Sequence, residues 1–229
     1  MKIGSVQNQD TEASLPMRLA VLSFGWQIGL LFLILQLQRA QHDPAQVIAP
    51  SADSSYLGAG IGEVVDAWRG VPVIANGENY LRSHGRHFSE DEYYYGKKWQ
   101  CVEYAKRFAK DALDHEMPDV MGHAISFFDP AVDHGQLNPA RDLIQYQNGS
   151  DDLPEPDDLI VWGMDGYGHI AVVTRVDQEN QFIEVIQQNI KRASRLRLPI
   201  EMSEEGYVIG IGRWAPLGWL RKQATSKTF

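Results

Sequence analysis

The sequence has a single cysteine, Cys101, among its 229 residues. One thiol cannot form an intramolecular disulfide, so the chain is not a small disulfide-stapled scaffold. Positive charge is also scarce, since 21 Lys and Arg face 30 Asp and Glu and give a net charge of -9. Such a surface repels phosphate backbones and argues against a nucleic-acid partner. A neutral or cationic ligand fits it better.

The chain is too short for two large domains, because a domain takes roughly 100 to 200 residues. Its hydrophobic fraction of 44% and charged fraction of 22% are typical of a globular protein. We expect a tail with an apolar segment over residues 1–40, a linker over 41–55, one domain over 56–220, and a polar C-terminal tail over 221–229. No internal repeat or low-complexity segment is found.

The longest apolar run covers residues 19–37 and is broken only by Ser23, Gln27 and Gln36. As a helix it would span about 28 Å, close to the hydrocarbon thickness of a bilayer. Three interpretations stay open: an uncleaved membrane anchor, a cleaved signal, and a helix of a soluble cytoplasmic domain. The poor cleavage site after the run favours the anchor. We therefore expect an apolar N-terminal helix and a membrane-anchored, periplasmic or secreted domain, and Met17 is a second possible start.

The hydrophobic periodicity predicts a helix that is followed by strands. Apolar residues recur at intervals of three and four over residues 99–113, which is the spacing of one helical face. Strands are expected at residues 158–162, 169–176, 182–189 and 207–214. A hairpin turn over residues 177–181 joins the second and third of these. The pattern indicates an α+β fold in which a helix packs on an antiparallel sheet.

Cys101 lies in the first turn of the predicted helix, where unpaired N–H groups and the helix dipole favour a thiolate. This position suits a nucleophile, and a buried structural cysteine is the alternative. The same N–H groups, with the side-chain amide of Gln100, could stabilise an oxyanion. His169 follows a glycine-rich turn and opens a strand, which suits a general base. The histidine spacings do not resemble a zinc site, and we expect no metal.

Three segments together resemble the CHAP family, the cysteine, histidine-dependent amidohydrolases and peptidases. They are YGKKWQCVEYAKRF over residues 95–108, GHIAVVT over 168–174, and QQN over 187–189. The likeness covers roughly residues 56–219 and is strongest to the glutathionylspermidine amidases. It implies a papain-like fold, Cys101 as the nucleophile, His169 as base and then acid, Gln100 as an oxyanion donor, and no cofactor.

The third catalytic position departs from the family pattern. The acid of the family aligns with Gln187, whose amide oxygen can orient an imidazole but cannot stabilise imidazolium by charge. Glu184 is the alternative acid. If Val176 opposes Phe182 in the hairpin, Gln187 shares a sheet face with His169 and Glu184 does not. A turn that is shorter by one residue would reverse this prediction.

Four further residues are candidates for substrate binding. Trp99 and Tyr95 could wall a substrate groove, although packing against the sheet is equally expected. Lys106 or Arg107 could reach a substrate carboxylate, with a surface role as the default. The resemblance implies a small amide substrate of the glutathionylspermidine type. If the domain is exported, a peptidoglycan peptide becomes the alternative substrate, and a non-catalytic binding module is a third hypothesis.

Overall fold

The structure is a computed structural model that describes residues 58–79, 81–119, 121–190 and 193–224. These residues belong to one compact unit, Pro44–Phe229. The predicted apolar helix at 19–37 and the predicted linker at 41–55 lie outside the described residues. Within the described ranges, no helix combines the length and the apolar character that crossing a bilayer requires.

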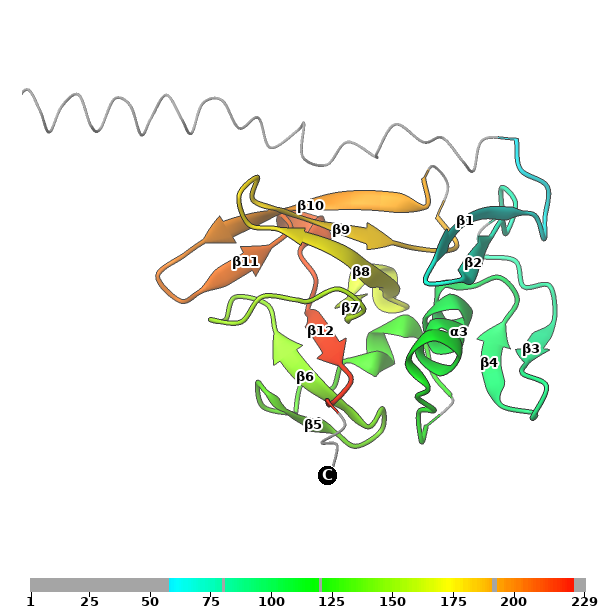
Figure 1. The fold of residues 1–229 in the computed structure, drawn as a ribbon, viewed down its shortest axis with the longest axis horizontal. Coiled ribbons are helices and arrows are strands. Elements are labelled where there is room, and N and C mark those ends of the chain that lie inside the picture. Colours follow the sequence, from blue (N-terminus) through cyan, green and yellow to red (C-terminus); the bar gives the residue numbers. More distant parts are fainter. Residues whose placement is uncertain (1–57, 80, 120, 191–192, 225–229) are drawn as a thin grey trace, which may run out of the picture. The chain divides into compact units, whose positions relative to one another are not determined.

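Among the described residues, hairpins and a sheet are arranged around the helix α3 (Figure 1). The strands are β1 Val64–Trp68, β2 Val71–Ile74, β3 Arg86–Phe88, β4 Tyr94–Lys97, β5 Gln136–Asn138, β6 Leu143–Gln147, β7 Leu159–Trp162, β8 His169–Asp177, β9 Phe182–Ile186, β10 Arg195–Met202, β11 Tyr207–Ile209 and β12 Gly218–Arg221. The helix is α3 Cys101–Leu113, and the 3-10 turns are η1 Ala124–Phe127, η2 Met164–Gly166 and η3 Gly212–Trp214.

Eight strands form one antiparallel sheet in the order β11-β10-β9-β8-β7-β12-β6-β5. Helix α3 packs against β8 and also contacts β4 and β2 (Figure 1). The predicted α+β fold, with the cysteine-bearing helix on an antiparallel sheet, is confirmed. The predicted order of helix before strands is wrong, because the hairpins β1-β2 and β3-β4 precede α3. The predicted strand over 207–214 ends at Ile209 and gives way to η3.

The central strands bury both of their faces. Towards α3 the buried cluster includes Cys101, Phe108 and Ile170, and on the other face it includes Trp162 and Trp219. Strands covered on both faces read as continuous apolar runs rather than as alternating ones. This explains why β7 and the first half of β8 show no polar alternation in the sequence.

The β8-β9 hairpin differs from the predicted register at its turn. Asp177, not Val176, opposes Phe182, so the turn is one residue shorter than expected. A bulge between Val173 and Arg175 then shifts the pairing back by one residue. From the bulge back to the start of β8, the pairing therefore has the register that the prediction assumed. The predicted strand over 182–189 ends at Ile186, and residues 187–189 follow it outside the strand.

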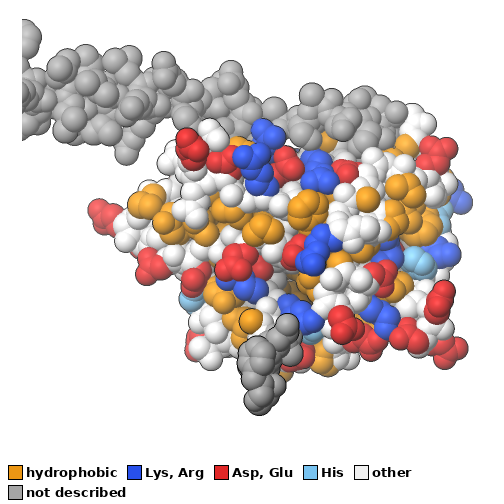
Figure 2. Space-filling view, in the orientation of Figure 1, with side chains coloured by type: hydrophobic (Ala, Val, Ile, Leu, Met, Phe, Trp, Pro, Cys, Tyr) orange, Lys and Arg blue, Asp and Glu red, His pale blue; other side chains and the backbone are white. Residues whose placement is uncertain are grey.

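Acidic and basic side chains are interspersed on the face shown in Figure 2, with apolar side chains between them. Charged side chains of the described residues also form ion pairs, such as the pair of Arg195 with Asp66 at 2.8 Å. The excess negative charge of the chain is therefore not gathered into one patch on this face.

Candidate active site

Cys101 is the first residue of α3 and is only 8% exposed. Backbone N–H groups of Ile170, Val102 and Cys101 itself lie near its sulfur and act to lower the pKa of the thiol. Burial nevertheless raises the pKa of the thiol to about 11, and the three N–H groups offset this only in part. The expectation that the helix start makes a thiolate is therefore corrected: in the resting domain the cysteine is a neutral thiol.

His169 opens β8 and is 9% exposed. The preceding Gly168 has φ +72, and a Cβ built there would lie 2.4 Å from the carbonyl oxygen of Trp162 and 2.6 Å from the nitrogen of Ile125. Only glycine fits this turn, so the turn fixes where the imidazole enters the sheet. Burial lowers the pKa of His169 to about 4, and the hydrogen bond with Gln187 opposes the shift. The imidazole is neutral at physiological pH.

Gln187 orients the imidazole. Its Oε1 lies 3.0 Å from Nε2 of His169, and its own Nε2 donates to the carbonyl of Ala193 at 3.4 Å. Because an amide oxygen only accepts, Nε2 of His169 carries the proton and Nδ1 carries the free lone pair. The backbone N–H of Ile170, the next residue, lies near the sulfur of Cys101, so the start of β8, which carries the imidazole, lies beside the start of α3.

Glu184 does not approach His169. Its carboxylate pairs with Arg197 at 3.1 Å and with Arg195 at 3.4 Å, and Thr174 donates to its backbone carbonyl. Of the two candidates for the third position, the structure brings Gln187 to the imidazole and holds Glu184 in an ion-pair cluster further along the hairpin.

The side chain of Gln100 is already hydrogen bonded. Its Nε2 donates to the carbonyl of Arg82 at 2.9 Å, and its Oε1 accepts from Asn189 at 2.8 Å. The bond to Arg82 takes up one of the two N–H groups of this amide. The predicted oxyanion role of Gln100 thus stays a prediction, whereas the backbone N–H groups at the sulfur are in place.

Residues 92–189 match the CHAP domain family. The match runs from just before β4 to the end of the segment that holds Gln187. The chain carries a CHAP domain. Its buried cysteine at the start of a helix is the arrangement of a cysteine-dependent amidase or peptidase, and the prediction of this enzyme class is confirmed.

A curated relative is trypanothione synthetase from Crithidia fasciculata. It is 27% identical over 124 residues, which are 53% of this chain and 19% of the relative. The chain thus spans less than a fifth of the relative's length. The likeness agrees with the CHAP assignment, and the activity of the whole relative does not transfer with it.

Four residues near the nucleophile were candidates for substrate binding in the CHAP domain. Tyr95 is buried and its hydroxyl donates to Asp111 at 2.6 Å, while Trp99 packs edge-on against His87 with ring centroids 5.3 Å apart. Lys106 is also buried and donates to the carbonyl of Tyr94. These contacts are internal packing.

Arg107 is 5% exposed, and its guanidinium donates to Glu103 at 2.6 Å and to the carbonyl of Pro72 at 2.8 Å. The expected surface position of Lys106 and Arg107 is therefore wrong, because α3 is enclosed by β4, β2 and the sheet. Their burial argues against direct contact of either cation with a substrate.

Three polar residues near Cys101 were not identified from the sequence. Glu103, Gln188 and His87 form a buried or half-buried network beside Cys101. Glu103 and Gln188 lie inside the segments that carry the family resemblance, so the motif itself was the available signal. His87 lies outside those segments, and nothing in its local sequence marks it.

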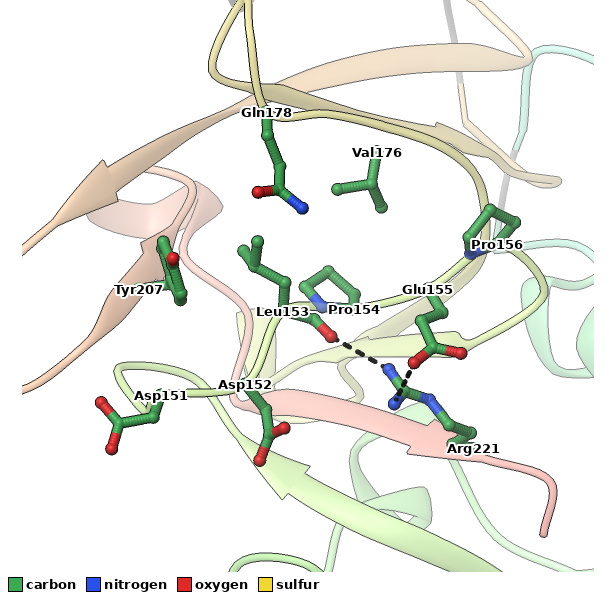
Figure 3. A pocket seen from close by; sticks show the side chains of 10 residues that line it. All are labelled: Asp151, Asp152, Leu153, Pro154, Glu155, Pro156, Val176, Gln178, Tyr207 and Arg221. Atoms are coloured by element: carbon green, nitrogen blue, oxygen red, sulfur yellow. Dashed lines mark hydrogen bonds and ion pairs between the residues drawn. The ribbon is translucent and has the colours of Figure 1, made fainter. Parts of the chain in front are cut away.

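A pocket of about 470 Å³ lies elsewhere on the domain (Figure 3). Its lining residues are Asp151, Asp152, Leu153, Pro154, Glu155, Pro156, Val176, Gln178, Tyr207 and Arg221. Arg221 crosses one side of the pocket, where it pairs with Glu155 at 2.8 Å and donates to the carbonyl of Leu153. Neither Cys101 nor His169 lines it, so this pocket is separate from the catalytic pair.

Proposed function

We propose that the chain is a cysteine amidohydrolase that cleaves an amide bond through a thioester on Cys101. The observation that carries the proposal is the arrangement of the pair: the backbone N–H of Ile170 lies near the sulfur at the helix start, and the adjacent His169 is oriented by Gln187. The reaction needs a nucleophile, a base and an orienting group, and these three supply them.

In the first half-reaction, Nδ1 of His169 takes the thiol proton of Cys101 while the sulfur attacks the carbonyl carbon of the amide. The backbone N–H groups at the helix start stabilise the oxyanion that forms. The C–N bond then breaks, and His169 returns the proton to the leaving nitrogen. The products are a free amine and a thioester. Because both groups begin neutral, proton transfer accompanies the attack rather than preceding it.

In the second half-reaction, a water molecule attacks the thioester carbonyl and gives its proton to His169. The C–S bond breaks, the proton returns to the sulfur, and a carboxylic acid leaves. The sum is one amide and one water converted to one acid and one amine. Gln187 keeps Nε2–H engaged throughout, so the lone pair on Nδ1 stays available.

For the substrate, we propose an amide that joins a glutathione carboxyl group to a polyamine. The resemblance to glutathionylspermidine amidases and the similarity to a trypanothione synthetase support this choice. The net charge of -9 also favours an approaching cation over an anion. The chain would act as a hydrolase on such conjugates.

A second candidate substrate is a peptide amide of peptidoglycan. The apolar run over residues 19–37 favours it, because a domain anchored at a membrane and facing outward meets the cell wall rather than a cytoplasmic conjugate. We propose this anchoring only together with the second candidate.

The test is hydrolysis by the full chain, with Cys101→Ala as the control. Release of spermidine from glutathionylspermidine that is lost in Cys101→Ala supports the first candidate, and release of wall fragments alone supports the second. If neither substrate is cleaved but one binds the wild type and Cys101→Ala equally, the chain is a binding module and the amidohydrolase proposal fails.

A further inference from the structure

The side chain of Gln188 joins three parts of the domain. Its Nε2 donates to Oε2 of Glu103 at 2.6 Å and to the backbone carbonyl of Gln100 at 3.0 Å. Its Oε1 accepts from the backbone N–H of Ile74 at 2.8 Å. Gln188 is completely buried, so water does not compete for these bonds. One amide thus ties the segment after β9 to β2 and to the start of α3.

Glu103 is the charged centre of this network. It lies two residues after Cys101 and is completely buried. Its Oε1 accepts from Nε of Arg107 at 2.6 Å and lies 2.7 Å from Nδ1 of His87. Burial alone would raise the pKa of Glu103, but the donors around the carboxylate hold it below its usual value. The carboxylate is therefore charged at neutral pH and holds its partners through charge-assisted hydrogen bonds.

The network includes residues that adjoin both reacting groups. Gln188 directly follows Gln187, whose Oε1 holds the imidazole of His169 at 3.0 Å. Gln100 directly precedes Cys101, and its carbonyl is the acceptor for Gln188. The hydrogen bonds of Gln188 therefore connect the segment after β9, which carries the orienting amide, to the start of the helix that carries the nucleophile.

We propose that Glu103 and Gln188 are positioning residues that fix the distance and orientation between Cys101 and His169. Both side chains are completely buried, so they act through the backbone beside the reacting groups and not on the substrate. The inference rests on the proposed function, because it assumes that thiol and imidazole react together. A misplacement of about 1 Å can cost about 100-fold in rate, so loosening either contact has a large effect.

The first test compares Glu103→Gln and Gln188→Met, which change little volume, with Asp158→Asn. Asp158 is another buried carboxylate paired with an arginine, but it precedes β7 at the end remote from His169. In the two network variants we expect kcat to fall about 10- to 100-fold with KM within about twofold. In Asp158→Asn, kcat should stay within about twofold, because this substitution affects only the stability of the fold.

The second test needs no substrate. The rate of alkylation of Cys101 by iodoacetamide is measured against pH with and without His169→Ala. In the wild type, removal of the imidazole changes the profile, since His169 accepts the thiol proton. In Glu103→Gln and Gln188→Met, we expect this dependence on His169 to shrink or vanish, whereas Asp158→Asn keeps it.

The proposal is overturned if the network variants fold, as judged by circular dichroism, and keep both kcat and the His169-dependent alkylation. If Glu103→Gln fails to fold, Gln188→Met decides, because it removes no charge. If the wild type cleaves no amide but the alkylation results hold, the proposed function fails while the positioning role stands.

Discussion

The active-site end and the remote end of the sheet each hold a buried carboxylate, and they hold it differently. Glu103, beside Cys101, contacts His87 on β3, Arg107 on α3, and Gln188 after β9. Asp158, before β7, contacts Arg221 on β12 at 2.7 Å and the backbone N–H of Glu155 at 2.7 Å. The first carboxylate links three elements, and the second has one charged partner.

The pKa values of the two carboxylates shift in opposite directions. Burial alone would raise both pKa values; the partners of Glu103 bring its pKa below the usual range, whereas burial keeps the pKa of Asp158 at about 6 despite Arg221. A single arginine does not compensate for the loss of water, and a set of donors from several elements does. Glu103, beside the reacting groups, therefore keeps its negative charge at neutral pH. Asp158, at the remote end, takes up a proton more easily.

The largest expected effect comes from removing the arginines. Arg107→Met leaves the charge of Glu103 buried with fewer partners and should cost about 3 to 5 kcal/mol of the free energy of unfolding at pH 7. Arg221→Met should cost about half as much, since Asp158 can take up a proton instead. Urea denaturation of the two variants measures both. Equal losses would mean that the two carboxylates do not differ in the way proposed.

The pH dependence of stability sharpens the comparison. Because the pKa of Asp158 is raised from 3.8 to about 6, its contribution is largest below pH 3.8 and is lost as pH rises through about 6. At about 1.36 kcal/mol for each pH unit, the span is about 3 kcal/mol. Glu103 has the opposite sign, with stability lost as pH falls below its usual value of 4.5.

The measurement is the difference in unfolding free energy between wild type and Asp158→Asn from pH 4 to 7. His169 contributes its own slope here, because its lowered pKa removes stability as pH falls from 6.5 towards about 4. That slope is common to both proteins and cancels in the difference. A difference that stays constant with pH would contradict the raised pKa of Asp158.

At the active-site end, Gln187→Glu should raise kcat about tenfold. A carboxylate beside Nε2 stabilises the imidazolium that forms as the thiol proton moves, and charge-assisted hydrogen bonds are about twice as strong as neutral ones. It should also raise the pKa of His169 from about 4, which a pH-rate profile shows as a shift of the acidic limb.

Glu184→Gln is the matched control for this variant. It removes a carboxylate of β9, three residues before Gln187, that is bound to Arg195 and Arg197. It should leave kcat unchanged. If Glu184→Gln abolishes turnover and Gln187→Glu does nothing, the third catalytic position has been assigned to the wrong residue.

The sequence predicted the parts of this end that depend on local pattern. The periodicity after Trp99 located α3 closely, and the glycine turn before His169 marked the entry of the imidazole. We predicted that Gln187 lies on the same sheet face as His169, but that prediction assumed a turn length that was wrong. The bulge between Val173 and Arg175 restored the register, and bulges of this kind leave no clear mark in one sequence.

The burial of the reacting groups could not be predicted from the sequence. A helix start favours a thiolate only while the sulfur stays in contact with water, and enclosure of Cys101 by β8 and η1 is a tertiary effect. The same enclosure buries Lys106 and Arg107, whose charges favour a surface position in any sequence pattern. The network around Glu103 depends on contacts between residues far apart in the chain, so it too emerges only in the fold.

The smallest expected effect concerns aromatic side chains at the two ends. Tyr167 lies in the loop that enters β8 and is 62% exposed, with its ring edge-on to His123 at a centroid distance of 4.8 Å. If His169 protonates the leaving amine, as we propose, this loop would lie on the leaving-group side, and Tyr167→Ala should raise KM about threefold with little change in kcat. Tyr207 lines the remote pocket (Figure 3), so Tyr207→Ala should leave both constants unchanged.

Initial-rate kinetics on one amide substrate measure both variants. If Tyr207→Ala changes KM as much as Tyr167→Ala does, the remote pocket takes part in substrate binding, and the division of the domain into a reacting end and a structural end is wrong.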